Sequence, residues 1–550
     1  MSPRTARGWL PLAAVFLLAL AAQVPLAWTW LQQPGERLLD NPFTGGHVWA
    51  AEVVSASLWR GEWPDPTDQA GFPQPREARF LGWAFLLVGA LLRPLLSPHL
   101  VVHLAHFLGP ALGGMALVLL ARRLRPQAEA GPLVLGGLLF ALSPVTLGAA
   151  LSGQVENAQT WILPLLLLLG LQAASRPGWL LLVPAAWGLA ALTSPYLAML
   201  AAFVAPLASL QARRDGASWG RAAAPLLLVV STLLAVQAWL DPGTFSPEAV
   251  LYRPSHGGGD WPPIWARPLP VASLDALLFG RAEIQIKANV LHQPYLGAVL
   301  VLAALLLGAQ RRRFLPLVLV GVGLALGPRL AWQGEPLLLG GHEVPLPAQL
   351  ARWLSLPIAH GGQYYRAVVL AHLGLALMIT AGRVGGRWRG LVLALSLVLG
   401  PLDALRSVDA PGLPWPTLEL PREAWERWAA DPAPGAVLHL PLESPRLLPN
   451  HPLRLAGIAV HGRALSDMPR AWTEPSTDPL MGRAWRSSHV RPTEPPPTLE
   501  ELGEAGFRYA VVDLPAIPER RSLMARLEQA WGRPDGEAAG LSWWRIGPES

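Results

Sequence analysis

The chain has no cysteine and only one lysine, Lys287, in 550 residues. Without cysteine it can have no disulfide framework, no thiolate metal site and no thiol nucleophile. Charge is also scarce, since 15% of the residues are charged, against roughly 25% in soluble globular proteins. Together with a hydrophobic share of 52% and a mean hydropathy of +0.34, this scarcity indicates an integral membrane protein.

The basic charge is almost entirely arginine, and the isoelectric point of about 10.2 could suggest a nucleic-acid partner. The position of the arginines excludes that partner, because they stand singly or in small groups beside apolar runs. Each group after the first follows such a run. The groups are Arg4 with Arg7, Arg122–Arg125, Arg176, Arg213–Arg221, Arg311–Arg313 and Arg383–Arg389.

Arginine near the ends of membrane spans stays on the cytoplasmic side. If all these groups are cytoplasmic, the chain crosses the bilayer an even number of times between successive groups. About 20 apolar residues are needed for each crossing. This condition predicts about 11 transmembrane helices, with the N-terminus in the cytoplasm. The predicted spans are Trp9–Leu31, His99–Ala121, Pro132–Leu151, Thr160–Ala174, Gly178–Leu192, Pro195–Gln211, Ala222–Leu240, Tyr295–Leu307, Phe314–Leu326, Arg366–Ala381 and Gly390–Ala404.

Two apolar runs are ambiguous as membrane spans. The first, Trp9–Leu31, is too long for a signal peptide and lacks a clear cleavage site, so we interpret it as an uncleaved span. The second, Phe80–Leu96, would put Arg122–Arg125 outside if it crossed. We therefore predict a helix on the membrane surface for residues 80–96, at the end of a long first outer loop, residues 32–97. The alternative is that this run crosses and the arginine rule fails locally.

The tail has a different composition, with acidic residues and the connector Pro495-Pro496-Pro497. Short strands are predicted at Val437–Leu440, Tyr509–Val512 and Ser542–Ile546, and helices at Leu499–Ala505 and Ser522–Trp531. The sequence thus predicts two domains, a transmembrane domain over residues 1–405 and a small extracytoplasmic α/β domain over residues 406–550.

Polar and ionisable residues gather at the outer ends of the predicted spans, whereas the inner loops hold little besides arginine. Any site is therefore expected to open to the outer face. Loop carboxylates are mostly solvated, so most of these residues need no functional role. The residues that we single out are Asp40, His47, Glu52, Gln154, Glu156, Asn157, Tyr196, Tyr295, Tyr365 and Arg366.

Arg366 breaks the arginine pattern by standing at an outer span end. An arginine there suits bidentate recognition of a phosphate, and the alternative is a side chain that reaches lipid phosphates. Glu156 adjoins a span in an apolar neighbourhood, where it could be functional, cap a helix or bond a neighbouring helix. His47 could be a general base, a metal ligand or a packed loop residue.

The organisation resembles the GT-C superfamily of integral-membrane glycosyltransferases over nearly the whole chain. A long first outer loop precedes a surface helix, and a span then ends in Leu119–Leu124, which includes two arginines. Ser143-Pro144 before Gly153–Asn157 is similar to a stretch of bacterial members. Three further stretches are similar to family sequences: Leu192–Tyr196, Gln293–Gly297 and Tyr364-Tyr365-Arg366.

The resemblance implies a polyprenyl-phosphate sugar as donor, a cell-envelope glycan, lipid or protein as acceptor, and a bacterial cytoplasmic membrane. It also implies a catalytic Asp or Glu in the first outer loop, often with a divalent cation, Mg or Mn, nearby. That carboxylate would take the proton of the acceptor hydroxyl, while Arg or a metal would stabilise the lipid phosphate that leaves.

This sequence departs from the family where Gly45-Gly46-His47 places a histidine at the position of the expected acid. Asp40 is the first candidate for the base, Glu52 the second, and His47 itself a third. Arg366 is expected to bind the donor phosphate, with Tyr365. The remaining cavity residues are expected to be Gln154, Glu156, Asn157, Tyr196 and Tyr295.

Two other functions stay open at this point. Without its base, the protein would only bind or help to assemble envelope glycans. A transporter is the third possibility, but transporters usually show internal repeats and ionisable groups deep in the membrane. No clear repeat is present here, and the polar groups lie at the outer ends.

Overall fold

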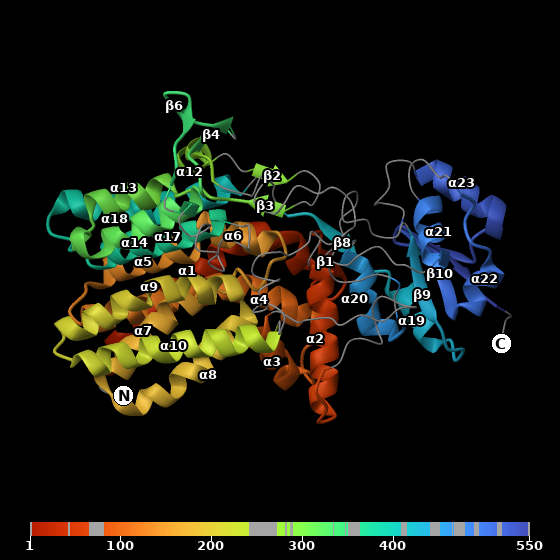
Figure 1. Cartoon of the computed structure of the whole chain (residues 1–550), viewed down its shortest axis with the longest axis horizontal. Helices are drawn as coiled ribbons and strands as arrows, with labels where there is room; N and C mark the ends of the chain where they lie inside the picture. The colour runs from red at the N-terminus through yellow and green to blue at the C-terminus, as the bar shows by residue number, and fades with distance from the viewer. Residues whose placement is uncertain are drawn as a thin grey trace.

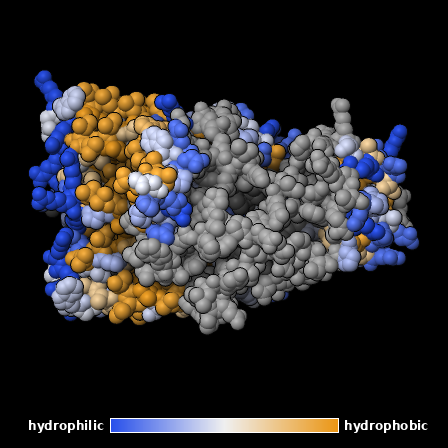
Figure 2. Space-filling view, turned by 45° about the horizontal axis from the view of Figure 1, so that its top comes forward, coloured by the Kyte–Doolittle hydropathy of each residue, from blue (hydrophilic) through white to orange (hydrophobic). Residues whose placement is uncertain are grey.

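The structure is a computed structural model that describes residues 3–41, 44–64, 82–240, 272–280, 283–285, 290–333, 335–346, 348–349, 364–408, 415–440, 452–464, 466, 479–488, 494–513 and 520–547. A body of long helices lies at one end of an elongated molecule, and a small sheet with short helices lies at the other (Figure 1). Hydrophobic residues cover much of the visible face of the helical body (Figure 2).

A helix lies at each predicted span, since long apolar runs satisfy their backbone groups within one segment. The helices of the body are α1 (Pro3–Gln32), α4 (Pro98–Leu124), α5 (Ala130–Ala141), α6 (Pro144–Leu151), α7 (Ile162–Ser175), α8 (Leu182–Thr193), α9 (Pro195–Arg214), α10 (Trp219–Leu240), α13 (Ala298–Leu306), α14 (Arg311–Ala325), α17 (Val368–Thr380) and α18 (Arg387–Ser407). Short 3-10 helices precede α8 and α17, at η1 (Pro177–Leu181) and η4 (Tyr364–Ala367).

Four of these helices, α1, α4, α9 and α18, are long and apolar enough to cross a membrane. The bent pair of α5 and α6 would make a fifth span. Large apolar side chains such as Leu10, Leu227 and Val398 are exposed on the helical body, as expected for a surface that faces lipid. The chain is therefore a polytopic membrane protein, and the number of about 11 crossings stays a prediction.

The predicted single span Pro132–Leu151 is two helices, α5 and α6, that meet at an angle of 40°. Pro144 has no N–H for a continuous helix and disfavours helical geometry at Ser143, whose ψ is 139°. The Ser143 hydroxyl bonds the Thr146 hydroxyl of the first turn of α6 at 2.7 Å. After the bend, α6 continues to Leu151, where the polar stretch begins.

The helix α17 is the centre of the body, because all thirteen of its residues are buried. It packs closely on α14 through small residues, a usual arrangement between membrane helices. A Cβ at Gly321 of α14 would meet the Ala371 nitrogen and lie 3.0 Å from the Ala367 carbonyl oxygen. A Cβ at Gly374 of α17 would lie 2.8 Å from Val318. The short η4 helix with Arg366 therefore leads directly into the most constrained element.

The predicted first outer loop contains a helix that the sequence analysis did not foresee, α2 (Thr44–Trp59), and a short strand, β1 (Arg37–Leu39). The helix α2 stands across the ends of the long helices (Figure 1). It packs against α4 and against α20 (Pro452–His461) of the tail. The predicted surface helix 80–96 is α3 (Trp83–Leu92), and its ten residues span about 15 Å, half of a bilayer core.

The tail forms a four-stranded sheet in the order β11 (Gly536–Ala538), β12 (Leu541–Arg545), β10 (Phe507–Asp513), β9 (Ala436–Leu440). The strand β10 pairs parallel with β9 and antiparallel with β12. Helices α21 (Pro479–Ser488), α22 (Leu499–Glu504) and α23 (Arg520–Trp531) accompany it. The three predicted strands and two predicted helices of the tail are confirmed.

Strand pairing also joins the helical body and the tail. The strand β1 pairs antiparallel with β8 (Thr417–Glu419), which precedes α19 (Arg422–Ala430). The helix α18 ends at Ser407, close to the predicted boundary at residue 405. The division into domains 1–405 and 406–550 stays a prediction.

The remaining elements are short. They are α12 (Leu274–Phe279) and three two-stranded hairpins, β2 (Glu283–Gln285) with β3 (Val290–His292), β4 (Ala331–Trp332) with β5 (Glu335–Pro336), and β6 (Leu338–Leu339) with β7 (His342–Glu343).

One buried ion network holds the tail sheet. The Asp431 carboxylate accepts from Arg508 Nε at 2.9 Å and from the Tyr509 hydroxyl at 2.7 Å. Burial opposes ionisation of Asp431, but these bonds outweigh it and hold its pKa below the usual range. Burial and the bond to Asp431 raise the pKa of Tyr509 to about 12.

The close approach of α14 and α17 can be tested at Gly321. We expect Gly321→Leu to destabilise the protein by about 1–3 kcal/mol, because the added side chain forces the two helices apart. The thermal midpoint of the full-length protein in detergent measures this effect. Gly390→Ala in α18 is the matched control, since a Cβ there meets no atom within 4 Å. Equal midpoints for the two variants would contradict the packing account.

Candidate active site

A buried polar segment of nonhelical backbone, residues 152–160, interrupts the apolar body between α6 and α7. Irregular backbone at such a place is tolerated where it is enclosed in protein or lines a cavity. Gly153 allows the turn with a φ of 74°, and a Cβ there would lie 2.5 Å from Asn41 Cγ. Its buried polar side chains are Ser152, Gln154, Glu156, Asn157, Gln159 and Thr160.

Internal hydrogen bonds stabilise this segment. The Gln159 amide donates to the Ala105 carbonyl at 3.1 Å and to the Val155 carbonyl at 2.9 Å. Its oxygen accepts from the Trp161 indole at 2.8 Å. These bonds hold the segment rigid, and we call residues 152–160 the wall of the site because other side chains pack against it.

Arg366 is 8% exposed and projects from η4 toward this wall. Its Nη2 donates to Gln154 Oε1 at 2.7 Å, and its Nε lies 3.4 Å from the Tyr365 hydroxyl. The guanidinium also stacks over the Tyr196 ring at 4.4 Å from the centroid. Arginine suits such a site because its planar fork combines directed donors with ring stacking.

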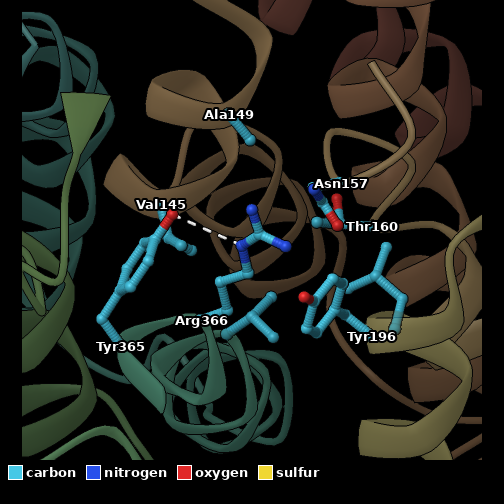
Figure 3. Close-up of a pocket in the computed structure, with 9 residues that line it drawn as sticks. Val145, Ala149, Asn157, Thr160, Tyr196, Tyr365 and Arg366 are labelled. Atoms are coloured by element: carbon cyan, nitrogen blue, oxygen red, sulfur yellow. Dashed lines mark hydrogen bonds between the residues drawn. The ribbon is translucent and has the colours of Figure 1, made fainter. Parts of the chain in front are cut away.

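Figure 3 shows the guanidinium between the rings of Tyr365 and Tyr196, with Asn157 and Thr160 on the far side of the cavity that it enters. The cavity has a volume of about 20 Å³, enough for roughly one water molecule. Four residues of the predicted set, Asn157, Tyr196, Tyr365 and Arg366, line it.

Glu156 connects the wall to the first outer loop. Its Oε2 lies 3.1 Å from His47 Nε2 of α2, and both side chains are about one-tenth exposed. Its Oε1 accepts from Asn157 Nδ2 at 3.1 Å. The His47 ring also meets the Phe85 ring of α3 edge-on, at 5.8 Å between centroids. The histidine that replaces the expected acid therefore touches a carboxylate from another loop.

Asn157 joins these groups into one network. Its Nδ2 lies 3.3 Å from Gln154 Oε1, the same oxygen that Arg366 bonds. Its Oδ1 accepts from the Ser194 hydroxyl at 3.1 Å. A continuous path of contacts thus runs from His47 through Glu156, Asn157 and Gln154 to Arg366.

Asp40 lies beside this network in sequence and in space. Its neighbour Asn41 packs against Gly153, and its own backbone N–H donates to the Pro416 carbonyl at 3.0 Å. The Asn41 carboxamide accepts from the Thr44 backbone at 2.9 Å and so caps the start of α2. The residue that follows the first candidate base therefore contacts the buried wall, while the backbone of Asp40 is bonded to the tail segment.

Two predicted site residues are not brought to this cluster. Glu52 forms an ion pair with Arg93 at 2.7 Å, and both side chains are partly exposed. Tyr295 bonds Asp403 at 3.1 Å and accepts from the Ala298 backbone at 2.8 Å. Tyr295 therefore supports the start of α13, and Glu52 joins α2 to the turn after α3.

The sequence analysis missed His103 of α4 as a positioning residue. His103 Nε2 accepts from the Leu39 backbone at 3.2 Å, and its ring stacks on Trp30 at 4.9 Å. This contact fixes the chain just before Asp40. The signal was present, because His99, His103 and His106 recur at helical spacing in an apolar helix.

A divalent cation would require several oxygen or imidazole ligands from the protein. Within the described ranges, no three His, Asp or Glu side chains stand close enough to hold one ion. The expected Mg or Mn stays a prediction, and we derive no chemical step through a metal.

No family model matches this chain, and no curated protein sequence matches it. Solved structures do. The mycobacterial arabinofuranosyltransferase AftD aligns with a TM-score of 0.54 and 16% identity over 99% of this chain. The chain spans 42% of the AftD chain.

Two other solved glycosyltransferases align with lower scores. The apo oligosaccharyltransferase of Archaeoglobus fulgidus has a TM-score of 0.49 and 12% identity, over 95% of this chain and 72% of its own. ArnT of Cupriavidus metallidurans has a TM-score of 0.44 and 14% identity, over 99% of this chain and 100% of its own. A second ArnT structure is bound to undecaprenyl phosphate. The alignment with AftD confirms the fold that the sequence resemblance implied.

The contact between His47 and Glu156 can be tested by a double-mutant cycle. We expect His47→Gln and Glu156→Gln to be non-additive by about 1 kcal/mol in stability, because residues in contact share one interaction energy. Thermal midpoints of the wild type, both single variants and the double variant provide the measurement. The control cycle pairs His47→Gln with the exposed Glu62→Gln. If the first cycle is as additive as the control, the contact is absent.

Proposed function

From the GT-C glycosyltransferase fold of this chain, we propose that the protein is a membrane glycosyltransferase that moves a sugar from a polyprenyl-phosphate donor to an acceptor hydroxyl. The observation that carries the proposal is the buried guanidinium of Arg366, which enters a cavity in an otherwise apolar body. A buried arginine is costly in the membrane and marks a functional site by default.

Arg366 would hold the donor phosphate. Charge-assisted bonds from a guanidinium fork to phosphate are short and strong, and they become more important as the leaving phosphate gains charge. Gln154 and Tyr196 orient the fork in advance, so little freedom is lost on binding. A cavity of about 20 Å³ cannot hold a sugar phosphate, so donor binding would open it.

The proposed reaction is a substitution at the anomeric carbon. The acceptor oxygen forms a bond to that carbon, the bond from carbon to the phosphate oxygen breaks, and polyprenyl phosphate leaves with the electron pair. The proton of the acceptor hydroxyl must pass to a base. We assign that role to His47, with Glu156 as the carboxylate that orients its ring, because neutral imidazole is a good proton acceptor.

Asp40 is the competing base, which the family resemblance favours. Its neighbour Asn41 contacts Gly153 of the same wall, whereas Glu52 is engaged by Arg93. The presence of Glu156 in the network of Arg366 supports an enzyme over a protein that only binds glycans. The polar groups of the described site form one cluster, which gives no support to a transporter.

The acceptor, the membrane and the orientation are further parts of the proposal. An envelope glycan, lipid or protein would be glycosylated on the outer face of a bacterial cytoplasmic membrane. The support is that Arg123 and Arg125 join the loops after α4, α7, α9 and α17, so that these arginine-bearing loops lie together on one side of the helical body.

The base assignment can be tested by transfer of labelled sugar from synthetic polyprenyl-phosphate donors in reconstituted membranes. We expect His47→Gln and Glu156→Gln to lower the transfer rate by about 10²–10⁴-fold, the usual contribution of a general base and its partner. The exposed Glu62→Gln is the control and should keep the wild-type rate.

Two outcomes would contradict this assignment. If Asp40→Asn alone abolishes transfer while both other variants stay active, Asp40 is the base. If the wild type transfers no sugar from any polyprenyl-phosphate donor, the proposed function fails.

The role of Arg366 can be tested by binding of a polyprenyl-phosphate analogue to the purified protein. We expect Arg366→Ala to weaken binding by about 2–3 kcal/mol, or roughly 30- to 150-fold, through loss of charged hydrogen bonds. Arg366→Lys should recover only part of this affinity, because lysine keeps the charge and loses the fork. Arg60→Ala, on the exposed surface, is the control. Wild-type affinity in Arg366→Ala would remove the residue from the phosphate site.

A further inference from the structure

The arginine groups of the loops meet at one end of the helical body. Arg123 reaches Asp215 at 3.6 Å and Ser175 at 3.1 Å, which joins the loops after α4, α7 and α9. Arg125 donates to the Ala381 carbonyl after α17. Figure 2 shows hydrophilic residues along the end of the body away from the tail. This end is a positively charged face next to an apolar surface.

A cavity of about 360 Å³ opens on this face. Its volume lies within the range of roughly 300–1,000 Å³ of small-molecule sites. The turn between α13 and α14, residues 307–310, forms one side, and the turn between α17 and α18 forms another. Three arginines line it: Arg125, Arg383 and Arg389. The helix α17 separates it from the cavity of Arg366, since Arg366 precedes this helix and Ala381 and Arg383 follow it.

The backbone around this cavity also favours an anion. The helices α14 and α18 both begin there, and the first N–H groups of a helix have no partner within it. Gln310, at the start of α14, holds a left-handed φ of 53°, which is uncommon for a residue with a side chain. Its side chain accepts from Arg313 at 3.0 Å. Gln310, which precedes α14, and Arg389, in the first turn of α18, both line the cavity.

The charges around the cavity are mostly unbalanced. Glu129 is the carboxylate found beside it among the described residues, and its Oε2 accepts from the Val384 backbone at 2.8 Å. Glu129 does not line the cavity. Arg383 and Arg389 are exposed, and Arg389 donates to the Arg383 carbonyl at 3.3 Å. A phosphate would supply the missing negative charge.

The rim of the cavity indicates a lipid as the source of that phosphate. Trp388, at the start of α18, is 67% exposed, and Leu391 and Leu395 continue an exposed apolar stripe along the same helix. Tryptophan at such a place marks the level of lipid headgroups. Basic pockets between membrane helices on the positive side bind anionic headgroups.

We propose that this arginine-lined cavity binds the phosphate of an anionic lipid headgroup, with Arg383 and Arg389 as the principal contacts and the acyl chains along α18. The phosphodiester would lie between the two helix starts, while Trp388 would lie at the glycerol level. This site does not depend on the proposed glycosyl transfer.

The experiment is a lipid titration of the purified full-length protein, followed by native mass spectrometry. Phosphatidylglycerol is compared with phosphatidylcholine, which has no net charge. We expect phosphatidylglycerol to bind more tightly, and Arg383→Gln with Arg389→Gln to weaken its binding by about 10- to 30-fold, at roughly 1 kcal/mol for each arginine. Glu129→Gln should strengthen binding, because it keeps the acceptor and removes a negative charge.

The matched control removes the same charge elsewhere on the same face. Arg176→Gln with Arg221→Gln should leave phosphatidylglycerol binding within about threefold of the wild type. If both double variants weaken binding equally, the whole face attracts lipid and the proposed site is wrong. A second arm adds inorganic phosphate. If inorganic phosphate displaces the lipid and stabilises the wild type alone, the cavity takes a soluble anion and the lipid assignment is overturned.

Discussion

The structure depends on one constraint: polar groups inside an apolar helical body must find their partners within the protein. The chain introduces such groups after α6 ends at Leu151, where Gly153 adopts a left-handed φ of 74°. The segment that follows bonds itself, α4 and η4, and so becomes a rigid wall. Arg366 can be buried, at 8% exposure, because its guanidinium donates to Gln154 of this wall and stacks over the Tyr196 ring. The candidate site therefore results from the hydrogen bonds that the nonhelical segment makes with the rest of the protein.

The two ends of the body have opposite chemistry, and each follows from its sequence. One end holds arginines beside helix starts, which leaves positive charge in excess at Arg383 and Arg389. At the other, a single arginine is enclosed with Glu156 and amide side chains. An exposed arginine can exchange its partner for a lipid phosphate at little cost. A buried arginine must already be oriented before the ligand binds, because stabilising the charge that develops on a leaving phosphate requires fixed donors.

Much of the fold could be predicted because apolar runs and arginine groups are local signals. The tail strands β9, β10 and β12 were predicted within two residues for the same reason. The helix α2 was missed, since Gly45-Gly46 indicates a loop and the contact with α20 that supports the helix comes from about 400 residues later. The span Pro132–Leu151 was read as one helix because its hydrophobicity is continuous across Pro144.

The site was predictable in part. Arg366 was found as the exception to the arginine pattern, and the 154–157 stretch as polar residues at a span end. The sequence predicts that a residue lies near the outer face, but it does not predict which helices are neighbours there. Tyr295 and Glu52 were therefore grouped with the site residues, although Tyr295 contacts Asp403 and Glu52 contacts Arg93. The contact of His47 with Glu156 joins residues 109 positions apart and has no local signal.

The most direct test of the account is an experimental structure of the protein with a polyprenyl-phosphate analogue bound. We predict the phosphate within hydrogen-bond distance of the Arg366 guanidinium, with the anomeric position on the side of His47 and Glu156. A phosphate bound elsewhere, with Arg366 still bonded to Gln154 in a closed cavity, would contradict the account.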